Sequence, residues 1–241
     1  MQVAQTDIIA RLRKDILIRE GLKINAAAAL PDIGLGSMNQ AFPDKTFPTG
    51  CIHECICDDR SGKTATAGFI AGIVSVLMKE GSVSVWIGPA NTIFPPALAA
   101  FGIDPCKIVF VELHREKDRL WAMEEALACE GLSAVVGEIA QLDFTASRRL
   151  QLAVEKSHVT GFVIRQTERL QTTACVARWK IRSAGSSLPE GMPGLGFPRW
   201  QVDLLRIRNG RPGSWQFEWN RQHFMEQKPS SSAIYARKKI V

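Results

Sequence analysis

Between residues 51 and 164, short apolar runs alternate with longer amphipathic segments along the chain. The apolar runs are rich in Val and Ile and have the length of buried strands, whereas the amphipathic segments repeat their apolar residues at helical spacing. This alternation favours right-handed βαβ units on a largely parallel, doubly wound α/β sheet. We expect strands at 51–56, 83–87, 108–111, 132–136 and 161–164, and helices at 63–79, 95–101, 116–129 and 145–157.

The pattern differs on either side of this alternation. Residues 4–22 place Ile8, Leu12 and Ile16 at helical spacing between charged residues, which predicts an amphipathic helix in an N-terminal segment, 1–30. Beyond residue 165, strand-like runs separated by Gly and Pro predict an antiparallel C-terminal extension of the sheet. We expect its strands at 174–182, 200–208 and 215–219, with a mobile loop at 183–198, a core domain spanning 31–221 and a disordered basic tail at 222–241.

Composition limits the class of protein. The chain has 241 residues, of which 46% are hydrophobic, enough for one well-buried α/β domain. No apolar run reaches the roughly 18 residues of a membrane span, so we expect a cytoplasmic protein without membrane contact. The net charge of +6 is modest and permits a weak DNA contact.

A short motif follows the first expected strand. Residues 61–64 read Ser-Gly-Lys-Thr and match the end of the phosphate-binding signature, in which amides cradle phosphate, the lysine reaches the β- and γ-phosphates and the hydroxyl holds Mg²⁺. Cys57 fills the first glycine position, and Asp58 and Asp59 add negative charge beside the phosphates. ATP with Mg²⁺ is the candidate ligand, and the candidate nucleotide-binding residues are Arg60, Ser61, Gly62, Lys63 and Thr64.

Longer strings are more specific than this motif. They are Pro-Thr-Gly at 48–50 with His-Glu at 53–54, Leu-Trp-Ala-Met-Glu-Glu-Ala-Leu at 120–127, Ala-Val-Val-Gly-Glu at 134–138, Thr-Ala-Ser-Arg-Arg-Leu-Gln-Leu-Ala at 145–153, Pro-Arg-Trp at 198–200 and Arg-Pro-Gly-Ser-Trp at 211–215. With them the layout from Gly36 to Trp219 resembles the RecA recombinase core, and most closely the ImuA family of damage-inducible mutagenesis proteins.

The resemblance implies a RecA-like fold and the role of an accessory (adaptor) protein in SOS-induced, error-prone translesion DNA synthesis. It also implies work with ImuB, a relative of the Y-family polymerases, and with an error-prone C-family DNA polymerase; contact with RecA is expected too. In recombinase filaments a pair of basic residues reaches the neighbour's nucleotide, and Arg206 and Arg208 fall near that place. Further candidates for a DNA or partner contact are Arg148, Arg149, Arg165 and Arg169, with a solvated helix face as the alternative.

Catalysis by a recombinase-type ATPase needs carboxylates that this chain lacks at the matching positions. Gly137 stands where a strand should end in aspartate. If the strand is regular, the next residue, Glu138, points to the opposite face from that position. The segment 88–91, Gly-Pro-Ala-Asn, has no glutamate to orient water, whereas Gln166 fits the γ-phosphate sensor. A non-catalytic adaptor is favoured; the alternatives are a DNA-stimulated ATPase in which Glu138 or Glu54 supplies the carboxylate, and a SulA-like inhibitor of cell division.

Residues 51, 53, 55 and 57 are Cys, His, Cys and Cys, and a regular strand would place all four on one face. Ligands spread along one strand at about 3.3 Å per residue cannot surround a single zinc ion. We therefore expect these side chains to pack in the core and expect no metal site.

Overall fold

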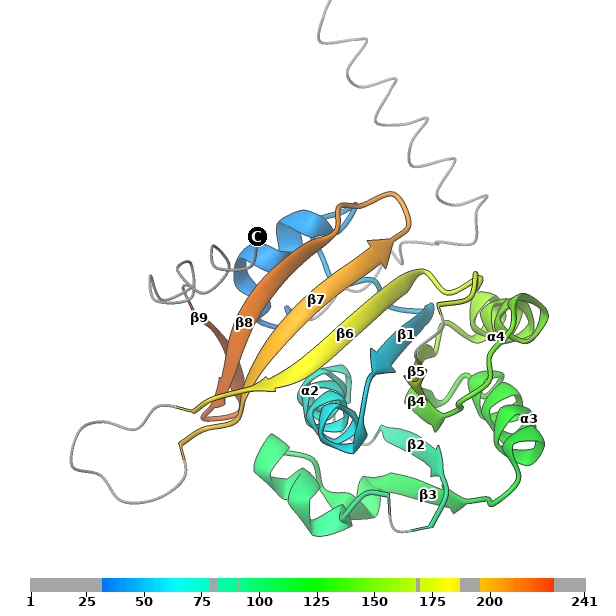
Figure 1. Ribbon diagram of the computed structural model, residues 1–241. Coiled ribbons are helices and arrows are strands. Elements are labelled where there is room, and N and C mark those ends of the chain that lie inside the picture. The colour runs from blue at the N-terminus through cyan, green and yellow to red at the C-terminus, as the bar shows by residue number, and fades with distance from the viewer. Residues whose placement is uncertain (1–31, 79–81, 91, 168–169, 187–195, 228–241) are drawn as a thin grey trace, which may run out of the picture.

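The computed structural model describes residues 32–78, 82–90, 92–167, 170–186 and 196–227. The strands in these ranges form one twisted sheet (Figure 1). The order across the sheet is β3-β2-β4-β5-β1-β6-β7-β8-β9. The strands are β1 (Ile52–Cys57), β2 (Val83–Gly88), β3 (Ile108–Glu112), β4 (Leu132–Glu138), β5 (Thr160–Gln166), β6 (Ala177–Ala184), β7 (Arg199–Ile207), β8 (Gly213–Asn220) and β9 (His223–Gln227).

Parallel pairing runs from β3 to β6, and antiparallel pairing runs from β6 to β9. The predicted α/β class, with a largely parallel sheet and an antiparallel C-terminal extension, is confirmed, and the topology is consistent with a RecA-like fold. The run predicted at 174–182 corresponds to β6, which is antiparallel to β7, as predicted, but parallel to β1, with His53 opposite Ala177. Strand β6 therefore joins the parallel part of the sheet to the antiparallel part.

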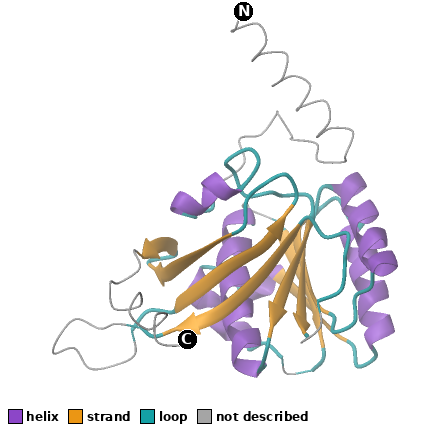
Figure 2. Cartoon of the chain, turned by 45° about the horizontal axis from the view of Figure 1, so that its top comes forward, coloured by secondary structure: helices purple, strands orange, loops and turns teal. Residues whose placement is uncertain are grey.

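Helices cover both faces of the parallel strands (Figures 1 and 2). On one face lie α2 and the short 3-10 helices η1 and η2, and on the other lie α3 and α4. Their bounds are η1 (Gly36–Ala41), α2 (Arg60–Leu77), η2 (Pro95–Phe101), η3 (Pro105–Lys107), α3 (Glu116–Leu127) and α4 (Phe144–Ser157).

Aromatic packing joins α2 to the antiparallel strands. The ring of Phe69 on α2 lies 5.7 Å from that of Trp200 on β7 and 5.0 Å from that of Phe224 on β9, between ring centroids. All three side chains are buried. Aromatic pairs at such distances add to the free energy of burial, so β9 belongs to the core.

The predicted disordered tail therefore begins too early, because residues 223–227 form β9. The rest of that tail, the N-terminal helix predicted at 4–22 and most of the mobile loop predicted at 183–198 lie outside the described residues.

Candidate functional site

The turn between β1 and α2 is shorter than a phosphate-binding loop. β1 ends at Cys57 and α2 begins at Arg60, so that only Asp58 and Asp59 lie between them. The signature needs several residues of open loop before its Gly-Lys pair. Here that pair already lies in the first turn of the helix.

Asp59 occupies the helix N-terminus, where a phosphate would bind. Its Oδ1 accepts a hydrogen bond from the amide of Gly62 at 2.7 Å, and its carbonyl accepts one from the amide of Lys63 at 3.0 Å. A carboxylate at this place satisfies free amides and complements the helix dipole, as a bound phosphate does. A phosphate at these amides would have to displace the chain's own carboxylate.

Lys63 is paired with a carboxylate of the chain. Its Nζ lies 2.5 Å from Oε2 of Glu138, whose side chain is 5% exposed, whereas the lysine side chain is 28% exposed. Glu138 lies on the opposite face of β4 from Gly137, as expected, but this is the face that meets Lys63. Val136 and Glu138 share the α2 side of β4, and a Cβ at Gly137 would instead meet Met123 of α3.

Two further residues position Glu138. A Cβ at Gly88 would lie 3.1 Å from the Glu138 Cδ, so glycine leaves room for the carboxylate. Arg119 donates to the carbonyl of Glu138 and to those of Leu113 and His114, each at 2.9 Å, and so ties the ends of β3 and β4 together. Sequence reasoning missed both roles, since nothing in the local pattern distinguishes Arg119 from the other charged residues of α3.

Thr64 and Gln166 lie beside the same turn. Thr64 is exposed, and its hydroxyl donates to the carbonyl of Arg60 at 3.1 Å. Gln166 stands opposite Cys57 in the register of β5 against β1, and its Nε2 donates to the carbonyl of Asp58 at 3.4 Å. The structure thus brings Lys63, Thr64, Gln166 and Glu138 together at this turn, each with a partner inside the chain, while Arg60 and Ser61 are exposed at the start of α2.

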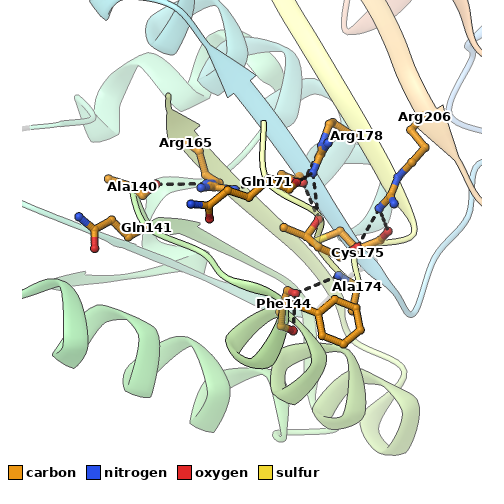
Figure 3. A network of polar contacts seen from close by, with 12 residues as sticks. Ala140, Gln141, Phe144, Arg165, Gln171, Ala174, Cys175, Arg178 and Arg206 are labelled. Carbon is orange, nitrogen blue, oxygen red and sulfur yellow. Dashed lines mark hydrogen bonds and ion pairs between the residues drawn. The ribbon is translucent and has the colours of Figure 1, made fainter. Parts of the chain in front are cut away.

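A second polar centre lies on the other face of β1. Glu54 is fully buried and pairs with Arg165 at 2.5 Å and with Arg178 at 2.9 Å. The hydroxyl of Thr173 donates to the same carboxylate at 2.7 Å. Arg165 comes from β5 and Arg178 from β6, and both are labelled in Figure 3. Because both oxygens are engaged by buried partners, Glu54 is unable to activate water at the loop, which contradicts its suggested catalytic role.

Arginines also hold the connection between β5 and β6. Arg206 donates to the carbonyls of Thr173 at 3.0 Å and Cys175 at 2.8 Å, and Arg208 donates to that of Ala174 at 3.3 Å. Figure 3 shows Arg206 directed at this segment. Both arginines are half-buried and stabilise their own chain, so a reach toward a neighbour's nucleotide would have to break these bonds.

The remaining candidate arginines do not form one surface. Arg165 is 2% exposed, so its predicted DNA contact was wrong. Arg148 pairs with Glu155 at 3.4 Å, and Arg149 pairs with Glu124 at 2.5 Å. Arg169 lies outside the described residues.

The Cys and His residues of β1 pack in the core, as predicted. Burial lowers the pKa of His53 to about 4, against a hydrogen bond to the Pro48 carbonyl that favours the charged ring. Burial also raises the pKa of Cys57 to about 11 and that of Cys175 to about 12. These thiols are therefore protonated near neutral pH and are poor ligands or nucleophiles. In the described part of the chain, no cluster of three or more His, Cys, Asp or Glu side chains could hold a metal ion.

Comparison with known proteins gives the family. No protein-family model matches the chain. The chain is 34% identical over 196 residues to the proteins called Protein ImuA from two strains of Caulobacter vibrioides, an alignment that covers 76% of this chain and 80% of each relative. The chain belongs to the ImuA family. Its sequence strings thus point to the right family of damage-inducible mutagenesis proteins. None of the helices that the structure describes is long and apolar enough to cross a membrane.

Proposed function

We propose that this chain is a non-catalytic adaptor in SOS-induced, error-prone translesion DNA synthesis, acting in the cytoplasm with ImuB, an error-prone C-family DNA polymerase and RecA. Membership of the ImuA family supports a role in damage-induced mutagenesis. Occupation of the phosphate site by the chain's own carboxylates carries the adaptor role: Asp59 fills the helix N-terminus and Glu138 neutralises Lys63. ATP binding would have to overcome both contacts. Hydrolysis would further need a free carboxylate to orient water, and general-base help is worth about 10²–10⁴-fold in rate.

An exposed aromatic side chain supports work with protein partners. Trp121 on α3 is 62% exposed, whereas Trp179, Trp200 and Trp219 are buried. Exposed aromatic residues are enriched among the anchors of protein interfaces. An adaptor uses such surfaces in place of a reaction centre.

The competing function is a DNA-stimulated ATPase, favoured by the position of Glu138 beside Lys63. Thr64→Ala separates the two functions, because it removes the hydroxyl that a Mg²⁺-nucleotide would need. In the described part of the chain, that exposed hydroxyl hydrogen-bonds only to the carbonyl of Arg60. The fold should therefore tolerate the change.

The test expresses the wild-type or Thr64→Ala chain in cells that lack the native gene and measures whether damage-induced mutagenesis returns. If the chain is an adaptor, Thr64→Ala restores mutagenesis to the wild-type level. The purified wild-type chain then shows no ATP turnover above background, with or without single-stranded DNA. Loss of mutagenesis in a folded Thr64→Ala protein would overturn the adaptor function and favour the ATPase. Capture of ImuB by the wild-type chain distinguishes an adaptor from a SulA-like inhibitor, which would instead bind the division machinery.

A further inference from the structure

The two edges of the sheet differ in how they are protected. Strands β3 and β9 each pair with a single strand in the described part of the chain, and they lie at opposite ends of the sheet (Figure 1). On β9 the carboxylate of Glu226 accepts hydrogen bonds from the amide and hydroxyl of Ser37 at the start of η1. On β3 residues 108–111 are all apolar, and charges stand only at the ends, on Lys107 and Glu112. Native edge strands are protected by charges, proline or a covering element, so β3 is the edge suited to pairing.

The hydrogen bond of Leu113 shows which backbone groups of β3 point to the open edge. Its amide donates to the carbonyl of Gly88, just at the end of β2, at 3.0 Å. Along a strand, successive residues direct their amide and carbonyl alternately to the two sides. Val109 and Val111 therefore direct these groups to β2 as well. The residues that direct them to the open edge are Ile108, Phe110 and Glu112.

The α3 side of this edge is apolar. Val109 is 50% exposed, and by alternation it shares this side of the strand with Val111, which packs against the core cluster of α3. Helix α3 itself packs on β2 and β4. A strand added beside β3 would therefore bury apolar surface on Val109 in addition to pairing the backbone.

We propose that β3 pairs with β3 of a second copy of this chain, in an antiparallel dimer with two-fold symmetry and one continuous sheet. Such an interface is self-complementary, because each copy presents the same edge to the other. Two strands of five residues bury less than about 1,200 Å², so the dimer is weak and reversible. This inference adds an assembly state to the proposed adaptor role and does not depend on that role.

The backbone fixes the register of this pair. In an antiparallel pair, hydrogen bonds form where outward-directed residues of both strands stand opposite each other. When Phe110 faces the partner's Phe110, every outward residue of β3 has an outward partner, whereas a shifted register leaves at least one without. Val109 then faces the partner's Val111. Lys107 comes to the end of the pair that holds the partner's Glu112, whereas a parallel pair would bring like charges together at both ends.

Sedimentation velocity of the purified full chain over a series of concentrations tests the dimer. Val109→Lys places a charge in the pair, and we expect it to raise the dimer dissociation constant at least about tenfold without lowering the urea midpoint. Met225→Lys is the matched control, because Met225 is 49% exposed on the opposite edge strand, β9; it should form dimers as the wild type does. A wild-type chain that stays monomeric at every concentration, including one whose edge accepts a strand only from another protein, would overturn the proposal. So would an equal loss in Met225→Lys.

Cysteine cross-linking tests the register independently of the lysine variants. Val109→Cys and Val111→Cys are made separately in a chain whose two exposed cysteines are replaced, Cys106→Ser and Cys129→Ser. Opposite residues that are not hydrogen-bonded to each other have Cα atoms about 4.5 Å apart, within the range of a disulfide. With copper–phenanthroline as oxidant, we expect the mixture of the two variants to cross-link at least about tenfold faster than either variant alone. Cross-linking of one variant alone at the rate of the mixture, or none in the mixture, would overturn the proposed pair.

Discussion

The ion pair between Lys63 and Glu138 predicts that the lysine of the degenerate loop stabilises the fold. Lys63→Met would leave a carboxylate that is 5% exposed without its cation. Breaking a fully buried pair costs about 3–5 kcal/mol and breaking an exposed pair less than about 1 kcal/mol. Because the lysine is 28% exposed, we expect an intermediate loss of about 2 kcal/mol. For a domain of this size that lowers the melting temperature by about 4–8 °C.

A double-mutant cycle measures the pair itself. Glu138→Gln should cost less than Lys63→Met, because a partly exposed ammonium regains water, and the double variant should show a coupling energy of about 1–2 kcal/mol. Urea unfolding followed by tryptophan fluorescence gives all four stabilities. Lys180→Met is the matched control: its Nζ lies 2.7 Å from Asp58, with side-chain exposure of 29% for the lysine but 58% for the aspartate. Coupling below about 0.5 kcal/mol, or an equal loss in Lys180→Met, would refute a structural role for Lys63.

Three other perturbations test the remaining groups. The folded-state pKa of His53, about 4, is below its unfolded value of 6.5. The unfolded chain therefore binds the extra proton, and about 3 kcal/mol of stability is lost as pH falls from 6.5 to 4. Urea midpoints across this range should fall steeply for wild type and less for His53→Asn, and parallel profiles for the two proteins would contradict the low pKa of His53. Asp59→Ala should cost about 1 kcal/mol through loss of the helix cap, whereas Asp59→Asn should recover most of it; equal urea midpoints for the two variants would show that the cap contributes nothing. Glu54→Gln should cost about 3–5 kcal/mol by leaving two buried arginines unpaired, against less than about 1 kcal/mol for Glu155→Gln at an exposed pair. Comparable losses in the two variants would show that the buried ion pairs of Glu54 stabilise the fold no more than an exposed pair does.

Apolar periodicity predicted the order of strands and helices because each element buries a continuous face. The bounds differed where local chemistry decides. Helix α2 begins at Arg60 and not at the expected residue 63, because Asp59 caps it. β4 extends to Glu138, beyond the apolar run, because pairing with Ile164 of β5 continues there.

Strand β9 was missed because its turn lacks the usual signal. Arg221 and Gln222 join β8 to β9 in a two-residue turn, and both have positive φ values of 50° and 64°. Such turns favour Asn-Gly or Gly, since side chains with a Cβ strain in this region. The ring of Phe224 packs 5.0 Å from Phe69, so burial of an aromatic side chain offsets a turn that sequence reasoning would reject.

The contacts of the candidate site could not be predicted from the sequence for a different reason, and this reason applies to any degenerate motif. Counting along β4 correctly separates the faces of Gly137 and Glu138, but only the position of α2 tells which face meets Lys63. Likewise Glu54 finds Arg165 and Arg178 more than a hundred positions away. Once a carboxylate replaces phosphate as the partner of the lysine, removal of the lysine costs stability even if no nucleotide ever binds. A surviving Gly-Lys-Thr in such a chain is therefore as consistent with an internal ion pair as with ATP, and loss of function in a lysine variant has to be separated from loss of fold before it counts as nucleotide chemistry.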